Sequence, residues 1–332
     1  MKRPVAAVAG TGRGLPKHVM TNHDFASIGI ETSHEWIMER SGISERRLAK
    51  NGETTCSMAS EASRRAMEAA GVHPGEIDVI VLSTATPDRL LPATDVDVQA
   101  ELGATRAAAF DVGAACAGWL YAMSTAEGLI MSGTAETALV IGSEKMSAIV
   151  DWTDRSTCVL FGDGAGAVVI ERVPERGFLA FELGADGAGG IDLQLPAGGS
   201  RNPTTAETVA RGQHYVEMNG RQVFKFATRV LVSSAKSVLA RSGLSVEDVD
   251  VYVPHQANVR IIDHAVAKLG IPEDRVVVNV DRYGNTSSAS IPLALGDAVA
   301  EGRVHAGATV LMTGMGAGLT WGSAIVRWTE AS

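Results

Sequence analysis

Cys116 is the residue of this chain best placed to act as a nucleophile. The apolar stretch from Ala107 to Val112 predicts a short buried strand, and the stretch from Ala117 to Met131 predicts a helix. Cys116 therefore lies at a helix N-terminus, where unpaired backbone N–H groups and the positive end of the helix dipole favour the reactive thiolate. The alternative is a structural cysteine, because free cysteine is among the residue types most often buried.

His255 is a second candidate. Among the eight histidines it is the one that ends a buried apolar strand and has polar neighbours, in the segment from Val253 to Asn258. Ligand sites of α/β proteins gather at the carboxyl ends of strands. The other histidines considered, His18, His23, His34 and His73, fall in polar segments.

Strands and helices alternate along the chain, which predicts βαβ units and a mainly parallel sheet. Apolar strands are expected at 5–9, 78–84, 138–142 and 165–171, and helices at 35–40, 54–71 and about 91–102. The run from Gly10 to Gly14 follows the first of these strands and predicts a glycine turn. A dinucleotide-binding oxidoreductase is disfavoured there, because Leu15 stands where the fingerprint needs its third glycine and Pro16 follows.

The order of segments repeats after about residue 174. The segments around Asp78, Cys116 and Ala138 match those around Asp250, Asn285 and Thr309, each at an offset of about 170 residues. Three matches in one order predict an internal duplication into halves 1–173 and 174–332, packed as one five-layered α-β-α-β-α body. A pseudo-twofold axis between the halves would bring Asn285 to Cys116, and His255 corresponds to the turn after the Asp78 strand.

Composition excludes several classes of protein. The 332 residues carry a net charge of -9, which disfavours nucleic-acid binding. No apolar run reaches the roughly 18 residues of a membrane span, and no signal-peptide core precedes Gly10, so we expect a cytoplasmic protein without membrane contact. Cys56, Cys116 and Cys158 have neither disulfide-framework nor zinc-ligand spacing, and we expect no metal.

Seven motifs in this order resemble the thiolase superfamily, and closely the 3-ketoacyl-acyl-carrier-protein synthase III family. They are Trp36-Ile-Met-Glu-Arg40-Ser-Gly-Ile, Ala115-Cys116-Ala-Gly, Asp154-Arg155-Ser-Thr, Phe161-Gly-Asp-Gly-Ala-Gly-Ala, His255-Gln-Ala-Asn258-Val-Arg260, Gly284-Asn285-Thr-Ser-Ser-Ala-Ser and Gly316-Ala-Gly-Leu-Thr-Trp-Gly-Ser-Ala. The resemblance implies a thiolase fold, a homodimer and a triad of Cys116, His255 and Asn285. It also implies ping-pong decarboxylative condensation of an acyl-CoA primer with malonyl-acyl-carrier protein, which initiates fatty-acid synthesis, with no cofactor beyond the coenzyme A thioester substrate.

The same resemblance assigns residues to binding. The oxyanion hole would be the backbone N–H groups of Cys116 and Ala317, although the family commonly has three glycines where this chain has Gly316-Ala317-Gly318. Trp36 and Arg40, four apart on one helix face, could clamp an aromatic base and a phosphate, unless the tryptophan simply packs on its neighbours. The full coenzyme A set implied is Thr32, Trp36, Arg40, Arg155, Phe224 and Asn258, with loop hydrogen bonding as the alternative for Arg155 and Asn258.

Two further expectations concern partners. Leu91 matches the position of an acyl-pocket residue that reaches across the dimer interface, and its small size predicts room for branched or longer primers. Lys225, Arg229 and Arg260 would attract an acidic carrier protein, unless they form an ordinary solvated helix face. The competing functions are a starter-unit or acyl-transfer enzyme of a secondary-metabolite pathway and a non-catalytic thiolase-like binding module.

Overall fold

The first of two twisted sheets holds five strands from the first half of the chain. The computed structural model describes residues 5–174 and 177–329. The strand order is β1-β7-β6-β4-β5. The strands are β1 (Val5–Gly14), β4 (Val79–Ser83), β5 (Ala108–Val112), β6 (Thr137–Lys145) and β7 (Asp163–Val173). Residues 1–4 and 330–332, at the outer ends of the two predicted halves, lie outside the described residues.

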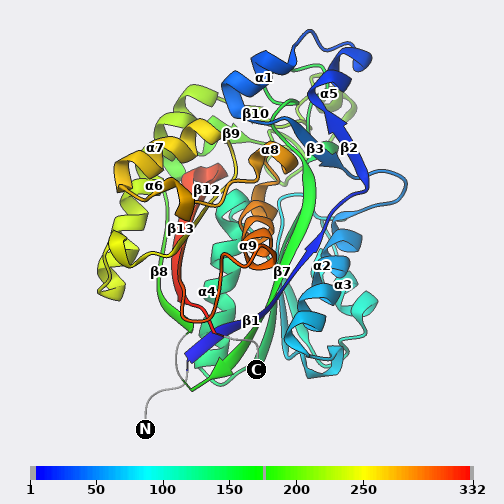
Figure 1. Cartoon of the computed structure of the whole chain (residues 1–332). Coiled ribbons are helices and arrows are strands. Elements are labelled where there is room, and N and C mark those ends of the chain that lie inside the picture. The colour runs from blue at the N-terminus through cyan, green and yellow to red at the C-terminus, as the bar shows by residue number, and fades with distance from the viewer. Residues whose placement is uncertain (1–4, 175–176, 330–332) are drawn as a thin grey trace.

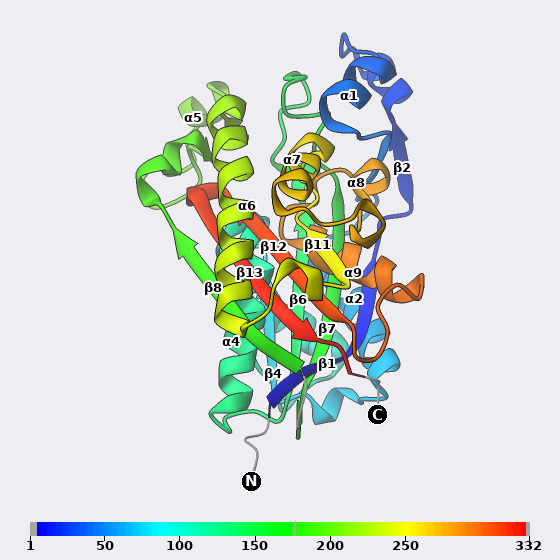
Figure 2. The same cartoon turned by 60° about the vertical axis from the view of Figure 1, so that its left-hand side comes forward.

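The second sheet repeats this pattern. Its strand order is β11-β12-β13-β8, and Val276 forms a parallel bridge to Tyr252 of β11 in the place that β5 takes beside β4. Its strands are β8 (Gly177–Ala185), β11 (Val251–Pro254), β12 (Thr309–Gly316) and β13 (Thr320–Arg327). Figure 2 shows this sheet face on, with β11, β12, β13 and β8 side by side. The strand order β8-β13-β12-β11 thus corresponds to β1-β7-β6-β4 of the first sheet, which is the arrangement that an internal duplication predicts.

The prediction of a mainly parallel sheet was wrong. β4 pairs with β5 and β6 in parallel, but β6 with β7 and β7 with β1 are antiparallel, and the second sheet repeats the same mixture. A parallel neighbour requires a crossover, usually a helix. The chain between β6 and β7 contains a single short 3-10 turn, η4 (Met146–Ala148), and so the strand returns antiparallel.

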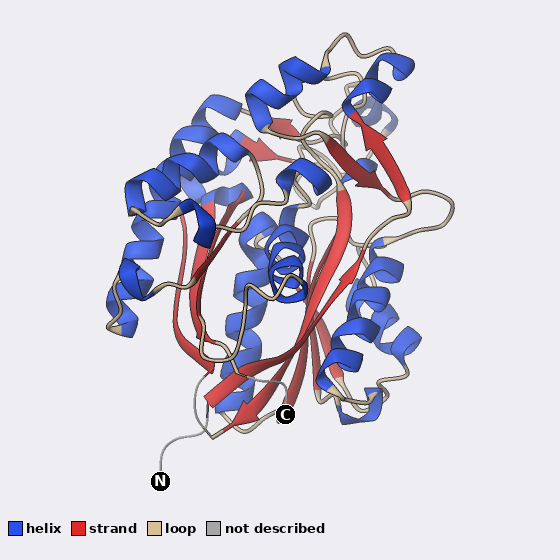
Figure 3. Ribbon diagram, viewed as in Figure 1, coloured by secondary structure: helices blue, strands red, loops and turns tan. Residues whose placement is uncertain are grey.

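Helices complete five layers (Figures 1 and 3). Helices α4 and α9 lie between the two sheets and contact both. Helices α2 and α3 cover the outer face of the first sheet, and α6, with α7 packed beside it, covers the second. The helices are α2 (Thr55–Ala70), α3 (Thr94–Leu102), α4 (Gly118–Met131), α6 (Gly220–Ser242), α7 (Val259–Leu269) and α9 (Ser290–Ala300). The expected five-layered thiolase arrangement is thus confirmed.

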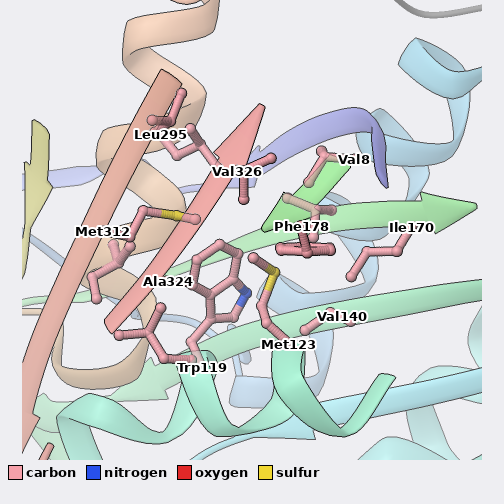
Figure 4. Packing of buried hydrophobic residues seen from close by; sticks show 14 of the residues in the cluster. Val8, Trp119, Met123, Val140, Ile170, Phe178, Leu295, Met312, Ala324 and Val326 are labelled. Carbon is pink, nitrogen blue, oxygen red and sulfur yellow. The ribbon is translucent and has the colours of Figure 1, made fainter. Parts of the chain in front are cut away.

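The central core sits where α4 meets both sheets. Trp119 and Met123 point from α4 into this core and are fully buried (Figure 4). Around them lie side chains of the first sheet, such as Val140 and Ile170, and of the second, such as Met312. Burial of this apolar surface is the main force that fixes one sheet against the other.

The remaining elements include two small sheets and short helices. Several of them, α1, β9 and β10 included, surround the cavity described below. They are β2 (His18–Thr21) with β3 (Glu45–Leu48), β9 (Leu193–Gln194) with β10 (Glu217–Met218), α1 (His34–Ser41), α5 (Ala206–Ala210), α8 (Val280–Tyr283), η1 (Asn22–Ile28), η2 (Pro74–Glu76), η3 (Ala115–Ala117), η5 (Gly187–Asp192), η6 (Val246–Asp248), η7 (Glu273–Arg275), η8 (Ser287–Ala289) and η9 (Ala317–Leu319). Within residues 5–174 and 177–329, none of the helices has the length and apolarity needed to cross a bilayer.

The prediction of a glycine turn from Gly10 to Gly14 was wrong, because these residues form the second half of β1. Its alternate glycines face α2, and the helix backbone lies directly against them. A Cβ at Gly12 would overlap the carbonyl oxygen of Ala62 and the amide nitrogen of Ala66. These glycines therefore allow β1 and α2 to pack closely. Because they lie in a strand, they do not form a dinucleotide-binding loop.

Gly12→Ala should lower the free energy of unfolding by about 1–3 kcal/mol, because the added methyl group must push α2 away from β1. Gly128→Ala is the matched control. Gly128 lies on the exposed face of α4 with nothing near its missing side chain, so alanine there should raise the stability by up to about 1 kcal/mol. Urea unfolding of both variants measures the two effects, and equal stability of Gly12→Ala and wild type would contradict the packing argument.

Candidate active site

Cys116, His255 and Asn285 line one cavity of about 510 Å³. Cys116 lies in η3, directly after β5, and His255 directly follows β11. Asn285 follows the Val276 segment through α8, at the position equivalent to Cys116 in the second half. All three are buried, with exposed fractions of 7%, 2% and 9%. The structure therefore brings together the three residues that the duplication singled out.

The backbone around Cys116 is tightly constrained. Ala115 has a φ of 46°, an unfavourable value for a residue with a Cβ, and this turn aims the next residue into the cavity. Gly316, at the end of β12, lies so close that a Cβ there would be 2.6 Å from Cys116 N. The backbone after β12, which includes Ala317, thus runs directly beside that of Cys116.

Burial dominates the electrostatics of the thiol. It raises the pKa of Cys116 to about 12, and the buried Glu144 carboxylate raises the pKa further, whereas a hydrogen bond with Ser287 and the Cys116 backbone amide lower it. The helix N-terminus thus acts in the expected direction but is outweighed by desolvation. Burial therefore opposes formation of the thiolate that the helix N-terminus favours.

His255 is neutral at physiological pH. Its complete burial lowers the pKa of the imidazole to about 4. Neither ring nitrogen has a hydrogen-bond partner within the described part of the chain. The ring is held through its backbone, where His255 N donates to Thr313 O of β12 at 2.8 Å. A neutral, unpartnered imidazole can either donate or accept a hydrogen bond from a molecule in the cavity.

The Asn285 amide has a defined orientation. Its Oδ1 accepts a hydrogen bond from Ser287 N at 2.9 Å. A backbone N–H pairs only with the carbonyl end of an amide, so the Nδ2 group is the end left to donate. The main chain of Asn285 is tied to the first half, since Asn285 N donates to Leu160 O at 2.8 Å and Gly162 N donates to Asn285 O at 3.0 Å.

Two polar residues that the sequence reasoning missed lie behind the thiol. Cys116 Sγ donates to Ser287 Oγ at 3.4 Å, and Ser287 Oγ donates to Glu144 Oε1 at 2.9 Å. Glu144 is fully buried near the end of β6. The one sequence signal for Glu144 is its place directly after the apolar run of β6, where a polar residue can still belong to the buried strand.

The mouth of the cavity carries Trp36 with two guanidinium groups over its ring. The Arg40 guanidinium carbon lies 4.5 Å from the Trp36 ring centroid, and that of Arg155 lies 4.9 Å from it. All three residues line the cavity. Arg155 also donates to Glu31 O at 2.8 Å. The predicted common face of Trp36 and Arg40 on α1 is confirmed.

The opposite wall comes from α6 and α7. Phe224, Asn258 and Arg260 line the cavity, and Arg260 lies over the Phe224 ring at 5.8 Å. Asn258 caps α7, because its Oδ1 accepts from Arg260 N at 2.9 Å, and its Nδ2 donates to Arg40 O at 2.8 Å. Lys225 and Arg229 are exposed on α6 and do not line the cavity.

A second, apolar cavity of about 100 Å³ opens on the other side of Cys116. Ala317 lines it, whereas Leu91 lines neither cavity and is 87% exposed. Thr32 precedes α1 and lines neither cavity. The apolar side chains that line the second cavity were not identified from the sequence; they are Met146, Ile149, Phe161, Leu193, Leu195 and Val216.

No group of three or more metal-ligating side chains occurs in the described ranges. Cys56 and Cys158 are buried free thiols, and burial raises their pKa values to about 12 and about 11. Neither lines the cavity that holds His255.

The alkylation rate of Cys116 in the free protein should rise about tenfold per pH unit between pH 7 and 9, because only a small thiolate fraction forms below the raised pKa. Iodoacetamide labelling followed by mass spectrometry of the Cys116 peptide measures this rate. Cys116→Ser gives the background from the other two thiols. A plateau near neutral pH would instead indicate a preformed thiolate–imidazolium pair.

The chain matches two models of known families. Residues 110–187 match 3-Oxoacyl-[acyl-carrier-protein (ACP)] synthase III, and residues 239–328 match its C-terminal part. A beta-ketoacyl-[acyl-carrier-protein] synthase III from Symbiobacterium thermophilum is 54% identical over 327 residues, which cover 98% of either chain.

Solved structures agree with this result. The 3-oxoacyl-[acyl-carrier-protein] synthase III from Aquifex aeolicus is 46% identical and superposes with a TM-score of 0.90, covering 97% of this chain and 100% of that one. The priming beta-ketosynthase of the R1128 polyketide pathway is 38% identical, with a TM-score of 0.92 and coverage of 100% and 98%. On these matches, and with its cysteine, histidine and asparagine in one cavity, the chain belongs to the 3-oxoacyl-[acyl-carrier-protein] synthase III family.

Proposed function

We propose that Cys116, His255 and Asn285 carry out the reaction of this family. The chain is a condensing acyltransferase that joins an acyl-CoA primer to malonyl-acyl-carrier protein with loss of CO2, the step that initiates fatty-acid synthesis. The observation that carries the assignment of residues is their convergence in one buried cavity from the two halves of the chain. In this proposal the half 1–173 supplies the nucleophile, and the half 174–332 supplies the imidazole and the amide.

Acylation comes first. The Cys116 sulfur attacks the primer's thioester carbonyl, a new S–C bond forms, and the bond to coenzyme A breaks as coenzyme A leaves with the thiol proton. The adjacent backbone N–H groups of Cys116 and Ala317 are the proposed donors to the tetrahedral oxyanion, supported by the close approach of Gly316.

Condensation follows in the same cavity. The malonyl group loses CO2, and the electron pair of the broken C–C bond attacks the acyl-enzyme carbonyl and releases the Cys116 sulfur. Negative charge rests meanwhile on the malonyl thioester oxygen. The neutral His255 ring and the Asn285 Nδ2 group are the proposed donors to that oxygen. The mechanism uses no cofactor beyond the two thioester substrates.

The carrier arm would enter through the mouth of the larger cavity. We assign Trp36, with Arg40 and Arg155 beside it, to the adenine and phosphates of coenzyme A, and Phe224 and Asn258 to the tunnel wall. Thr32 is assigned to the polar part of coenzyme A by resemblance alone. Arg260 at the mouth and the exposed Lys225 and Arg229 on α6 form the proposed landing site for the acidic carrier protein.

We further propose a cytoplasmic homodimer. On the edge of the first sheet, β5 pairs with β4 alone among the described strands, and an open edge of this kind is normally covered. Leu90 and Leu91 nearby are 83% and 87% exposed, which suits burial against a second copy. In this arrangement Leu91 of one protomer reaches the acyl pocket of its partner.

Cys116→Ala should abolish acyl-enzyme formation, detected as loss of the mass increase on incubation with acyl-CoA. His255→Ala and Asn285→Ala should keep that acylation within about tenfold of wild type but lower condensation by about 10² to 10³, because each removes a donor to the developing negative charge. Release of CO2 that requires malonyl-carrier protein separates condensation from simple acyl transfer to another acceptor. Acylation lost as completely in His255→Ala as in Cys116→Ala would contradict this division of roles.

Primer selection should depend on Leu91. The wild type should accept isobutyryl- and hexanoyl-CoA as well as acetyl-CoA, and Leu91→Phe should shift kcat/KM toward acetyl-CoA by about tenfold, since a larger side chain fills the pocket. Leu90→Phe is the matched control, because it adds the same bulk at the neighbouring exposed position. An outright preference of the wild type for acetyl-CoA would overturn this assignment.

A further inference from the structure

Ser287 lies between the nucleophile and a buried negative charge. Its Oγ accepts a hydrogen bond from Cys116 Sγ at 3.4 Å and donates one to Glu144 Oε1 at 2.9 Å. Ser287 and Glu144 are 2% and 0% exposed. The described basic side chains form no ion pair with Glu144, although they pair with other carboxylates of the chain.

Glu144 accepts hydrogen bonds from several donors besides Ser287. Ala85 N donates at 3.1 and 3.0 Å to its two oxygens, Thr86 Oγ1 donates at 2.6 Å, and Ser288 Oγ donates at 2.8 Å. Donors to the charged form compensate for the cost of burying it. These contacts remain if Ser287 withdraws its own hydrogen bond, so the Glu144 side chain keeps other hydrogen-bond partners without Ser287.

Ser287 has one hydroxyl hydrogen and two possible acceptors. While Cys116 is a thiol, the S–H donates to Ser287 and the serine hydroxyl can point to Glu144. Once the thiol has lost its proton to the cavity, the sulfur becomes an anion that needs a donor. We propose that the Ser287 hydroxyl then turns from Glu144 to the Cys116 thiolate, and so acts as a catalytic donor that stabilises the attacking form of the sulfur.

The backbone at Ser287 supports a functional placement. Its φ of 51° lies in the left-handed region, which is costly for a serine and typical of residues held in place for function. The same residue donates its N–H to Asn285 Oδ1 at 2.9 Å. One strained residue thus orients the asparagine amide and places a hydroxyl against the sulfur.

Two titratable groups face Cys116. Glu144 comes from β6 and raises the pKa of the thiol, and His255, from the end of β11, is neutral because burial lowers its pKa to about 4. Of the elements packed against η3, η8, η9 and β12 carry no titratable side chain. Helix α4 carries Tyr121, whose hydroxyl donates to Gly184 O, and Glu127, and β13 carries Arg327. A change in the titration of Cys116 after substitution of Ser287 therefore reports on the serine hydroxyl.

This proposal rests on the proposed function only in taking Cys116 as the nucleophile, and alkylation tests it without any substrate. The rate of iodoacetamide labelling at Cys116 is measured from pH 7 to 10 in Ser287→Ala and Ser287→Gly. In both variants Cys116 should be labelled about tenfold more slowly at each pH below its pKa. This slowing corresponds to a rise of about 1 in the pKa of the thiol when the serine hydroxyl is lost. Glycine suits a φ of 51°, so Ser287→Gly removes the hydroxyl without backbone strain.

Ser288→Ala is the matched control, because Ser288 donates to the same Glu144 oxygen and is not hydrogen-bonded to Cys116. It should change the labelling rate by less than about twofold, whereas Glu144→Gln should accelerate labelling by removing the nearby negative charge. Unchanged or faster labelling in both Ser287 variants, or equal slowing in Ser288→Ala, would overturn the proposal. Failure of the proposed function would appear separately, as wild-type protein that labels normally but forms no acyl-enzyme.

Discussion

The close approach of two backbone segments, one from each half of the chain, determines the geometry of the whole site. Cys116 follows the edge strand of the first sheet, and Gly316 is the last residue of β12, an interior strand of the second. The gap between them leaves no room for a Cβ at Gly316. Because α4 and α9 are shared by both sheets, this contact depends on packing throughout the core. A small shift of one sheet against the other would separate the nucleophile from His255 and Asn285.

Burial then determines the charge states of the Cys116 thiol and the His255 imidazole. Cys116 and His255 are both neutral at rest, since desolvation opposes the charged form of each. A neutral imidazole offers no positive charge to bind the malonyl carboxylate. In the proposed mechanism it offers a hydrogen-bond donor, together with the Asn285 amide, to an oxygen that becomes negative only when CO2 leaves. In that proposal the site stabilises charge where the reaction creates it, which is the basis of electrostatic catalysis.

Duplication made the main site residues predictable, because Cys116 and Asn285 occupy equivalent positions and His255 follows a matching strand. Glu144 and Ser287 were not predictable in this way. The expected strand ended at Gly142, since the polar residues after it are typical of a loop, whereas β6 continues to Lys145 and buries Glu144. The glycines of β1 were misread for a related reason: their role depends on a helix that packs against them from elsewhere in the sequence. In both cases the role of the residue depends on contacts with segments that are distant in the sequence.

The cavity mouth concentrates positive charge in a chain whose net charge is -9. Arg40, Arg155 and Arg260 form no ion pair with the described carboxylates, although eight other arginines do. Arg40 and Arg155 instead lie over Trp36, and apart from the bond that Arg155 donates to Glu31 O, stacking does not occupy their hydrogen-bond donors. An arginine paired with a carboxylate would have to break that pair before it could bind a phosphate. Stacking on an aromatic ring thus orders these side chains and leaves their charge available to an anion.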